Sequence, residues 1–340
     1  MKRTGYLLVL FVWLVLLAAS CKSMDLIVSK SNAPDDSNST ESTGQAELPS
    51  TSAAHKFRVG ISLQDESPFV MRVSYELQRI IKDKAPDVEL VIYNGETNPL
   101  MQTAHVESFI SAGFDLILLD PISYEECKPA VMIANEANIP IITFITLVSN
   151  QADCLSFVGS SHLESGIIEA EMVAQSLNGK GQIVILEGVM GISAQKERFD
   201  GYNNVFDKYP GITVVAIQTA AWQRSEAEAI VENWIDSGKK FDVVVSENDN
   251  MAMGAVAAIE KAGLTGEISV FGIDGDPDAL QAVKDGRLAG TVYQDAVKQA
   301  QTLFECIQKL KLSEKIESSY LIPFESVTPG NVDDFLSRYN

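Results

Sequence analysis

The sequence predicts an α/β protein with two similar lobes, each holding a parallel sheet that helices cover on both faces. Two consecutive runs of apolar, β-branched strands alternate with helical patterns, as is typical of parallel sheets buried on both sides. Runs of about five strands favour two lobes over one oversized sheet. The expected strands are Phe57–Ser62, Val88–Tyr93, Asp115–Leu119, Ile141–Phe144 and Ser156–Val158 in the first run, and Gln182–Leu186, Thr213–Ile217, Asp242–Val245, Ser269–Ile273 and Gly290–Tyr293 in the second.

Residues 1–21 are typical of an export signal. Lys2 and Arg3 precede an apolar stretch from Tyr6 to Leu17, which is shorter than the roughly 20 residues that a membrane span needs. The small residues at 18–20 followed by Cys21 resemble a bacterial lipobox, so we expect Cys21 to be the acylated first residue of the mature protein. A plain signal peptide with an incidental cysteine and a short uncleaved anchor are the alternatives. The sequence therefore predicts an extracytoplasmic, lipid-anchored protein of the cell surface or periplasm.

Composition restricts the class of partner. Residues 22–55 are rich in Ser, Thr, Asn, Asp, Glu and Pro, so we expect a disordered tether that cannot bury enough apolar surface to fold. Removal of the signal leaves 24 of the 26 basic residues against 46 acidic residues, a formal charge of −22, which disfavours nucleic acid as a partner. Cys127, Cys154 and Cys306 are odd in number and lack metal-ligand spacing, so they are interpreted as small apolar residues.

Three polar side chains follow directly on strands of the second run. Asn248, Asp274 and Gln294 each stand where an apolar strand turns towards a helix. Ligands of open α/β sheets bind beyond the carboxyl ends of the strands, so these residues are candidates for one site. For Asn248 and Gln294, helix capping and surface polarity are the alternative roles. For Asp274 the alternative of capping is weaker, because Asp276 before Pro277 is expected to be the helix cap.

Two further residues of the second run are ambiguous from the residues alone. Trp222 lies in a loop before the predicted capping box Ser225-x-x-Glu228, where its ring could cover a ligand or pack onto the helix start. Trp234, by contrast, lies on an apolar helix face and is expected in the core. Arg198 lies just off an apolar helix face, so its alternative is a solvated charge.

The order of motifs resembles the periplasmic sugar-binding proteins of ABC transporters, with the glucose/galactose binders and the ribose binders most similar. The motifs span Phe57 to Tyr339 and are Phe157–Ile168, Thr219–Trp222, Glu247–Ala255, Phe271–Asp274 and Leu288–Val292. The resemblance implies a type I periplasmic-binding-protein-like fold with two Rossmann-like lobes and three hinge crossings near residues 161, 294 and 323. The first lobe would hold residues 56–161 and 295–322, and the second 162–294 and 323–340.

The resemblance also implies roles for particular residues. Arg198, Asn248, Asp274 and Gln294 would bind sugar hydroxyls, with Ser67 and Gln195 as further ligand residues. Phe69 and Trp222 would sandwich the sugar ring, because pockets of this kind combine aromatic walls with a few polar groups.

The departures from the family pattern predict altered selectivity. Ser67 stands where the glucose/galactose binders carry an acid, Ile145 and Thr146 follow the fourth strand, and Ile192 and Ala194 replace polar residues. We therefore expect a ligand with fewer hydroxyls towards the first lobe, and weak binding of glucose and galactose. The stretch matching the calcium loop of the glucose/galactose binders has Lys180 and Val184 at ligand positions, so no metal and no cofactor is expected.

These observations predict the substrate-binding lipoprotein of an ABC sugar importer, a monomer that captures a monosaccharide or sugar-like polyol by hinge closure and delivers it to permease subunits. A sensory protein of the same fold, reporting to a histidine kinase or chemoreceptor, is the alternative. An enzyme is not expected, because His55, His105 and His162 are the only histidines and no Ser-His-Asp or Cys-His arrangement is evident. A LacI-type repressor is disfavoured by the export signal.

Overall fold

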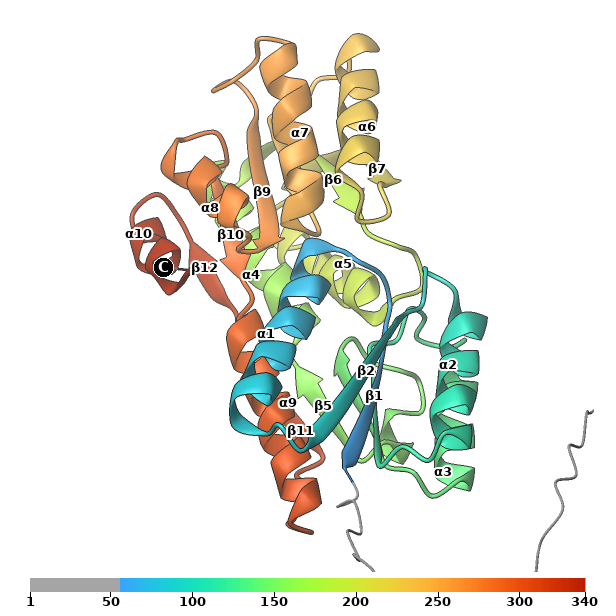
Figure 1. Ribbon diagram of the computed structural model, residues 1–340. Helices are drawn as coiled ribbons and strands as arrows, with labels where there is room; N and C mark the ends of the chain where they lie inside the picture. Colours follow the sequence, from blue (N-terminus) through green and yellow to red (C-terminus); the bar gives the residue numbers. More distant parts are fainter. Residues whose placement is uncertain (1–55, 340) are drawn as a thin grey trace, which may run out of the picture. The chain divides into compact units, whose positions relative to one another are not determined.

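The computed structural model describes residues 56–339, which form two six-stranded sheets (Figure 1). The first sheet has the order β11-β5-β4-β3-β1-β2 and its pairings are all parallel. Its strands are β1 (Phe57–Leu63), β2 (Val88–Asn94), β3 (Leu116–Leu119), β4 (Ile141–Ile145), β5 (Ser156–Gly159) and β11 (Ser319–Leu321).

The second sheet repeats this order as β12-β10-β9-β8-β6-β7, with only β12 antiparallel to its neighbour β10. Its strands are β6 (Lys180–Glu187), β7 (Gly211–Thr219), β8 (Val243–Ser246), β9 (Ser269–Asp274), β10 (Gly290–Tyr293) and β12 (Glu325–Val327). The predicted fold class and all ten predicted strands are confirmed. The strands β11 and β12 were not predicted, because each has three residues and is mostly exposed, so neither shows a buried strand pattern.

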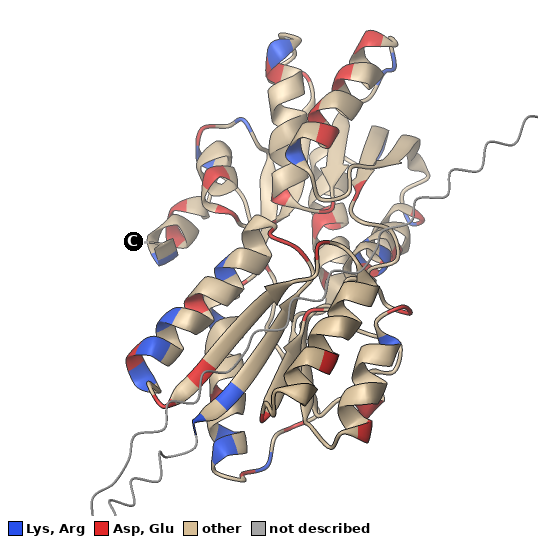
Figure 2. Ribbon diagram, turned by 45° about the vertical axis from the view of Figure 1, so that its right-hand side comes forward, with Lys and Arg blue, Asp and Glu red and all other residues tan. Residues whose placement is uncertain are grey.

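Helices cover both faces of each sheet, and successive strand residues alternate between the two cores as the pleat requires. In β3, Leu116 and Leu118 pack with α1 and α9, whereas Ile117 and Leu119 pack with α2 and α3. Charged residues gather on the outer helices and are sparse on the strands (Figure 2). The helices of the first lobe are α1 (Pro68–Lys84), α2 (Pro99–Ser111), α3 (Lys128–Glu136) and α9 (Ala296–Lys311). Those of the second are α4 (His162–Ser176), α5 (Ser193–Phe206), α6 (Arg224–Asp236), α7 (Asp249–Lys261), α8 (Pro277–Lys284) and α10 (Val332–Leu336).

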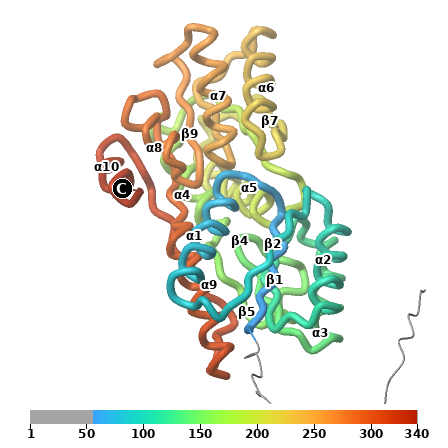
Figure 3. Tube along the Cα trace, viewed as in Figure 1, coloured from blue at the N-terminus to red at the C-terminus, as the bar shows by residue number. Residues whose placement is uncertain are grey.

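The chain passes three times between the two sheets, as the colours of the trace show (Figure 3). It leaves the first sheet at residues 160–161, between β5 and α4, and returns at 294–295, between β10 and α9. It crosses again at 322–324, between β11 and β12. We propose that these three short crossings are the hinge and that they divide the chain into the two lobes.

Two predicted helix starts are wrong in detail. Helix α6 begins at Arg224 after Gln223, and no side chain caps it, so Ser225 is not the cap. At α8 the N-cap is Asp276 as predicted, but its carboxylate makes no capping hydrogen bond. That carboxylate instead forms an ion pair with Arg72 of α1, in the other lobe, because an opposite charge competes well for a buried carboxylate.

Three of the predictions concern segments outside the described residues: the signal peptide, Cys21 as lipidation site and the tether at 22–55. Within residues 56–339, none of the helices is long and apolar enough to cross a bilayer.

Helices α4 and α5 approach each other through glycine. A Cβ atom at Gly166 would overlap the carbonyl oxygen of Arg198, and one at Gly201 would lie 2.6 Å from the carbonyl oxygen of Leu163. The two backbones can therefore pack closely only because these positions lack side chains.

We expect Gly166→Ala to lower the free energy of unfolding by about 1–3 kcal/mol, because the added methyl must push α5 away. Denaturant unfolding checks this, with Gly330→Ala as the matched control, since its new Cβ would meet its nearest atom at 3.7 Å. Equal stability of the two variants would contradict the close packing of α4 on α5.

Candidate ligand-binding cleft

The strand ends of the two lobes face a shared cleft of about 350 Å³, the place where open α/β sheets bind ligands. Six of its lining residues come from the first lobe: Gln64, Ser67, Phe69, Val70, Ile145 and Thr146. The others come from the second lobe and the hinge: His162, Ala194, Arg198, Trp222, Asn248, Asp274 and Gln294.

The structure brings together every predicted ligand residue except Gln195. Ser67, Phe69, Arg198, Trp222, Asn248, Asp274 and Gln294 all line the cleft. Gln195 lies on the same helix as Arg198, but its amide donates to Glu187 Oε1 at 2.8 Å and the residue is not part of the lining. Its prediction as a ligand residue has no support in this arrangement.

Arg198 is a buried cation and not the solvated charge that its place beside an apolar helix face allowed. Only 4 % of it is exposed. Its guanidinium donates to the carbonyl oxygen of Glu247 and lies 3.5 Å from Asp274 Oδ1. Its Nε has no partner among the described residues. Since a buried guanidinium needs its N–H groups satisfied, the free Nε is a donor for which the described residues offer no acceptor.

Asp274 ends β9 in an unusual conformation. Its φ of 130° is rarely adopted by a residue with a side chain. Its carbonyl oxygen accepts a hydrogen bond from the backbone N–H of Gln294 at 3.0 Å, so the strained strand end also positions Gln294. Burial raises the pKa of the Asp274 carboxyl well above its usual range, and the nearby Arg198 charge opposes that rise.

A second buried carboxyl holds the loop after Asp274 in place. Asp249 accepts hydrogen bonds from Thr291 Oγ1 at 2.7 Å and from the backbone N–H of Asp276 at 2.8 Å. Burial and the neighbouring Asp276 raise the pKa of Asp249 to about 7. The carboxylate of Asp249 is engaged in these two hydrogen bonds and does not cap α7. The cap of α7 is Asn248, whose Oδ1 accepts a hydrogen bond from Met251 N at 2.9 Å.

Asn248, Gln294 and Ser67 keep polar groups for the cleft. Asn248 uses Oδ1 as the helix cap, which leaves its Nδ2 amide to donate. Neither side-chain atom of Gln294 has a partner within residues 56–339, although Gln294 is 1 % exposed. Ser67 precedes α1 without capping it. Buried polar groups without protein partners are costly, so this set indicates a polar ligand.

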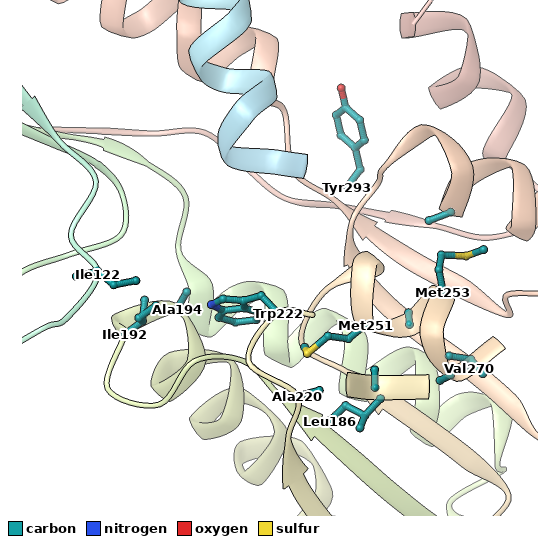
Figure 4. Packing of buried hydrophobic residues seen from close by; sticks show 14 of the residues in the cluster. Ile122, Leu186, Ile192, Ala194, Ala220, Trp222, Met251, Met253, Val270 and Tyr293 are labelled. Atoms are coloured by element: carbon teal, nitrogen blue, oxygen red, sulfur yellow. The ribbon is translucent and has the colours of Figure 1, made fainter. Parts of the chain in front are cut away.

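Trp222 serves both the cleft and the core. It lines the cleft but is 5 % exposed and belongs to an apolar cluster with residues from both lobes, where Figure 4 shows it between Ala194 and Met251. A Cβ atom at Gly188 would overlap the indole ring, so this glycine makes room for it. The Arg198 guanidinium lies 5.7 Å from the ring centroid, and the indole Nε1 has no partner among the described residues.

Sequence reasoning missed Gln64, Thr146 and His162. Gln64 follows β1 at a strand end, a signal that would have identified it, and its Oε1 has no partner in the described part of the chain. From the sequence, Thr146 was interpreted as a departure from the family's polar ligand residues, yet it lines the cleft. Its hydroxyl donates within the first lobe, towards Asp120 and Pro121. The first lobe is therefore less depleted of polar groups than the sequence suggested.

Three of the nine non-glycine residues that have positive φ within residues 56–339 line the cleft. Ile145, Trp222 and Asp274 line it and all have positive φ, at 60°, 64° and 130°. Such conformations cost of order 1–3 kcal/mol each and persist where the surroundings impose them. The backbone conformation of these three residues is therefore imposed by the surrounding structure and not by local backbone preference.

A cleft between two Rossmann-like lobes, with an aromatic wall and buried, partly unsatisfied polar groups, defines a solute-binding protein of the two-lobe type. The family model described as a periplasmic binding protein domain matches residues 59–315, and the chain belongs to that family. This confirms the predicted family, which is one of binding proteins.

Individual relatives are similar over most of their length. A xylitol-binding protein of Mycolicibacterium smegmatis is 33% identical over 81% of this chain and 78% of its own. A ribose import binding protein of Bacillus subtilis is 29% identical over 82% of this chain and 90% of its own. The crystal structure of an ABC transporter solute-binding protein from Bacillus halodurans with bound myo-inositol is 34% identical, with a TM-score of 0.81, covering 85% of this chain and 100% of that one.

The positions that match the calcium loop lie at the start of the second sheet. Lys180 begins β6 and Val184 is buried inside it. Within the described range, residues 56–339, no group of three or more His, Cys, Asp or Glu side chains is placed to hold a metal ion.

We expect Trp222→Ala to weaken ligand binding by about 1–3 kcal/mol and also to lower stability, because the ring contacts both cleft and core. Of the two roles that the sequence left open for Trp222, covering a ligand or packing onto the helix start, the burial of the ring allows both. Calorimetry and thermal unfolding measure the two effects.

Trp234→Ala is the matched control, since Trp234 lies on α6 against Phe241, with 6.3 Å between the ring centroids. It should cost about 3–5 kcal/mol of stability without changing affinity. Unchanged ligand affinity in Trp222→Ala would show that Trp222 is purely a core residue.

Proposed function

We propose that this protein is the substrate-binding component of an ABC importer and that it captures a neutral polyol. The observation that carries the proposal is the buried polar lining of the cleft. Arg198, Gln294 and Trp222 keep atoms without protein partners, which hydroxyl groups can satisfy because each hydroxyl both donates and accepts.

The cleft is suited to rings or chains with several hydroxyls. The Asp274 carboxyl can bind two neighbouring hydroxyls, and Arg198 beside it can donate to one of them. Phe69 and Trp222 offer apolar surface to the C–H groups of the ligand, and we propose that they enclose it from two sides.

Relatives favour a polyol over a common hexose. The relative named for xylitol and the solute-binding protein solved with bound myo-inositol are each more than 30% identical to this chain, and both ligands are polyols without a carbonyl group. The ribose relative, at 29% identity, makes a pentose the second candidate. The sensory role has no such support, because the ribose relative is named as an import protein and the myo-inositol relative as a transporter component.

Ion pairing and hydrogen bonding between the lobes are consistent with capture by hinge closure, a motion that periplasmic binding proteins use. Arg72 of α1 pairs with Asp276, and on another part of the interface Leu147 N donates to Ser193 Oγ at 2.8 Å. A ligand between the lobes would add contacts to both and favour this closed form.

The remaining parts of the proposal concern location and partners. The lipobox resemblance at residues 18–21 supports anchoring of a monomer to the membrane through Cys21, beside the permease subunits that receive the ligand. We propose no catalysis and no cofactor, because the cleft polar groups are arranged to bind hydroxyls and none forms a nucleophile and base pair.

We expect calorimetry on the purified protein to show tighter binding of myo-inositol or xylitol than of glucose or galactose, by at least tenfold, about 1.4 kcal/mol. Asp274→Asn should weaken polyol binding by about 100-fold, because the amide disrupts the hydrogen bonds to ligand and to Arg198. Asp278→Asn, at an exposed acid of α8, is the control. Tighter binding of glucose or galactose than of every polyol and pentose tested would contradict the proposal.

The anchor is tested separately. We expect Cys21→Ala to move the protein from the membrane fraction to the soluble fraction or to block its maturation, because the acceptor of the lipid is lost. Cys154→Ala serves as the control, since Cys154 lies inside the folded lobe. Unchanged membrane fractionation of Cys21→Ala would exclude lipidation at this residue.

A further inference from the structure

His162 is a cleft residue with a polar atom that the protein leaves unused. It is the first residue of α4, immediately after the first crossing between the lobes, and it is 1 % exposed. It lines the cleft beside Arg198 and Asp274. Its ring packs near Phe324 of the third crossing, with 6.0 Å between the ring centroids.

The hydrogen bond at one ring nitrogen determines the state of the other. His162 Nε2 lies 2.7 Å from the carbonyl oxygen of Ile145, and a carbonyl can only accept, so Nε2 carries the proton. Burial, and then the charge of Arg198, lower the pKa of His162 to about 3. The ring is therefore neutral at physiological pH, and Nδ1 presents a lone pair.

That lone pair has no partner in residues 56–339, where Nδ1 is a buried unsatisfied atom. Of the charged groups that line the same cleft, Arg198 directs Nη1 to Glu247 and Nη2 to Asp274. Neither its Nε nor the Asp274 carboxyl makes a hydrogen bond to Nδ1. Because an unsatisfied buried acceptor is costly, a hydrogen-bond donor from the ligand would remove that cost.

We propose that Nδ1 of His162 accepts a hydrogen bond from a hydroxyl of the bound polyol and so determines specificity. This inference rests on the proposed function. Because the acceptor is neutral and obligatory, the site requires a donor at that position of the ligand and disfavours an ether, a methoxy group or a carboxylate there. The Ile145 hydrogen bond comes from β4 of the first lobe, so the imidazole links the ligand to both lobes at the hinge.

Two substitutions isolate the acceptor. His162→Asn places an amide oxygen near the position of Nδ1, whereas His162→Phe keeps a flat ring without any acceptor, and both lose the bond to Ile145. With myo-inositol and xylitol as probes in calorimetry, we expect His162→Phe to bind at least about tenfold more weakly than His162→Asn. Equal affinities of the two variants for both probes would overturn the inference.

Nitrogen NMR on the wild-type protein tests the tautomer without relying on either variant to fold. Long-range proton–nitrogen correlation, with His105→Gln to assign the signals, should show a bare Nδ1 and a protonated Nε2 on His162 down to pH 5. Addition of myo-inositol should shift the Nδ1 signal in the direction of hydrogen bonding. A protonated ring at pH 6, or an Nδ1 signal unmoved by saturating ligand, would overturn the inference.

The same experiments separate the two proposals. If the wild type binds neither polyol, the proposed function is wrong, and so is the proposed hydrogen bond between a ligand hydroxyl and His162. If the wild type binds but the variants do not differ, only the role of His162 is wrong.

Discussion

The burial of one cation, Arg198, is the constraint on which the cleft depends. Desolvating a guanidinium is costly unless polar partners compensate it. Here the carbonyl oxygen of Glu247 accepts a hydrogen bond from Arg198, and the carboxyl of Asp274 lies 3.5 Å from it. The compensation requires α5 to approach α4, which Gly166 permits. Helix packing in the second lobe is thus coupled directly to the position of the guanidinium that lines the cleft.

Carboxyl groups below the cleft extend this coupling. Glu169 accepts from Tyr202 and from Ser246 N, and burial raises its pKa to about 8. Asp249, with a pKa of about 7, secures the loop after Asp274. The raised pKa values of Glu169 and Asp249 favour their neutral forms, which lowers the repulsion that several ionised carboxylates around a single arginine would create.

Strain and unsatisfied polar groups occur together in the cleft. Trp222 and Asp274 have positive φ, and Gln294 and His162 keep polar atoms without partners in the described residues. The positive φ values and the unsatisfied polar atoms make a form in which the two lobes are closed less stable than its packing alone would allow. A ligand that satisfies the polar atoms would gain differential affinity for the closed form, which is what hinge closure requires.

The sequence by itself determined the two-lobe fold and most of the lining, because strand pattern and strand-end position are local features and parallel strands bring their carboxyl ends together. The places of Asp274 and Gln294 in the cleft could be predicted in this way. Tertiary structure alone decided that Arg198 is buried, because that depends on the close approach of α4 at Gly166, and that Gln195 turns to Glu187. It also decided the tautomer of His162, since Nε2 faces a carbonyl oxygen 17 residues earlier in the chain, a contact that no local pattern encodes.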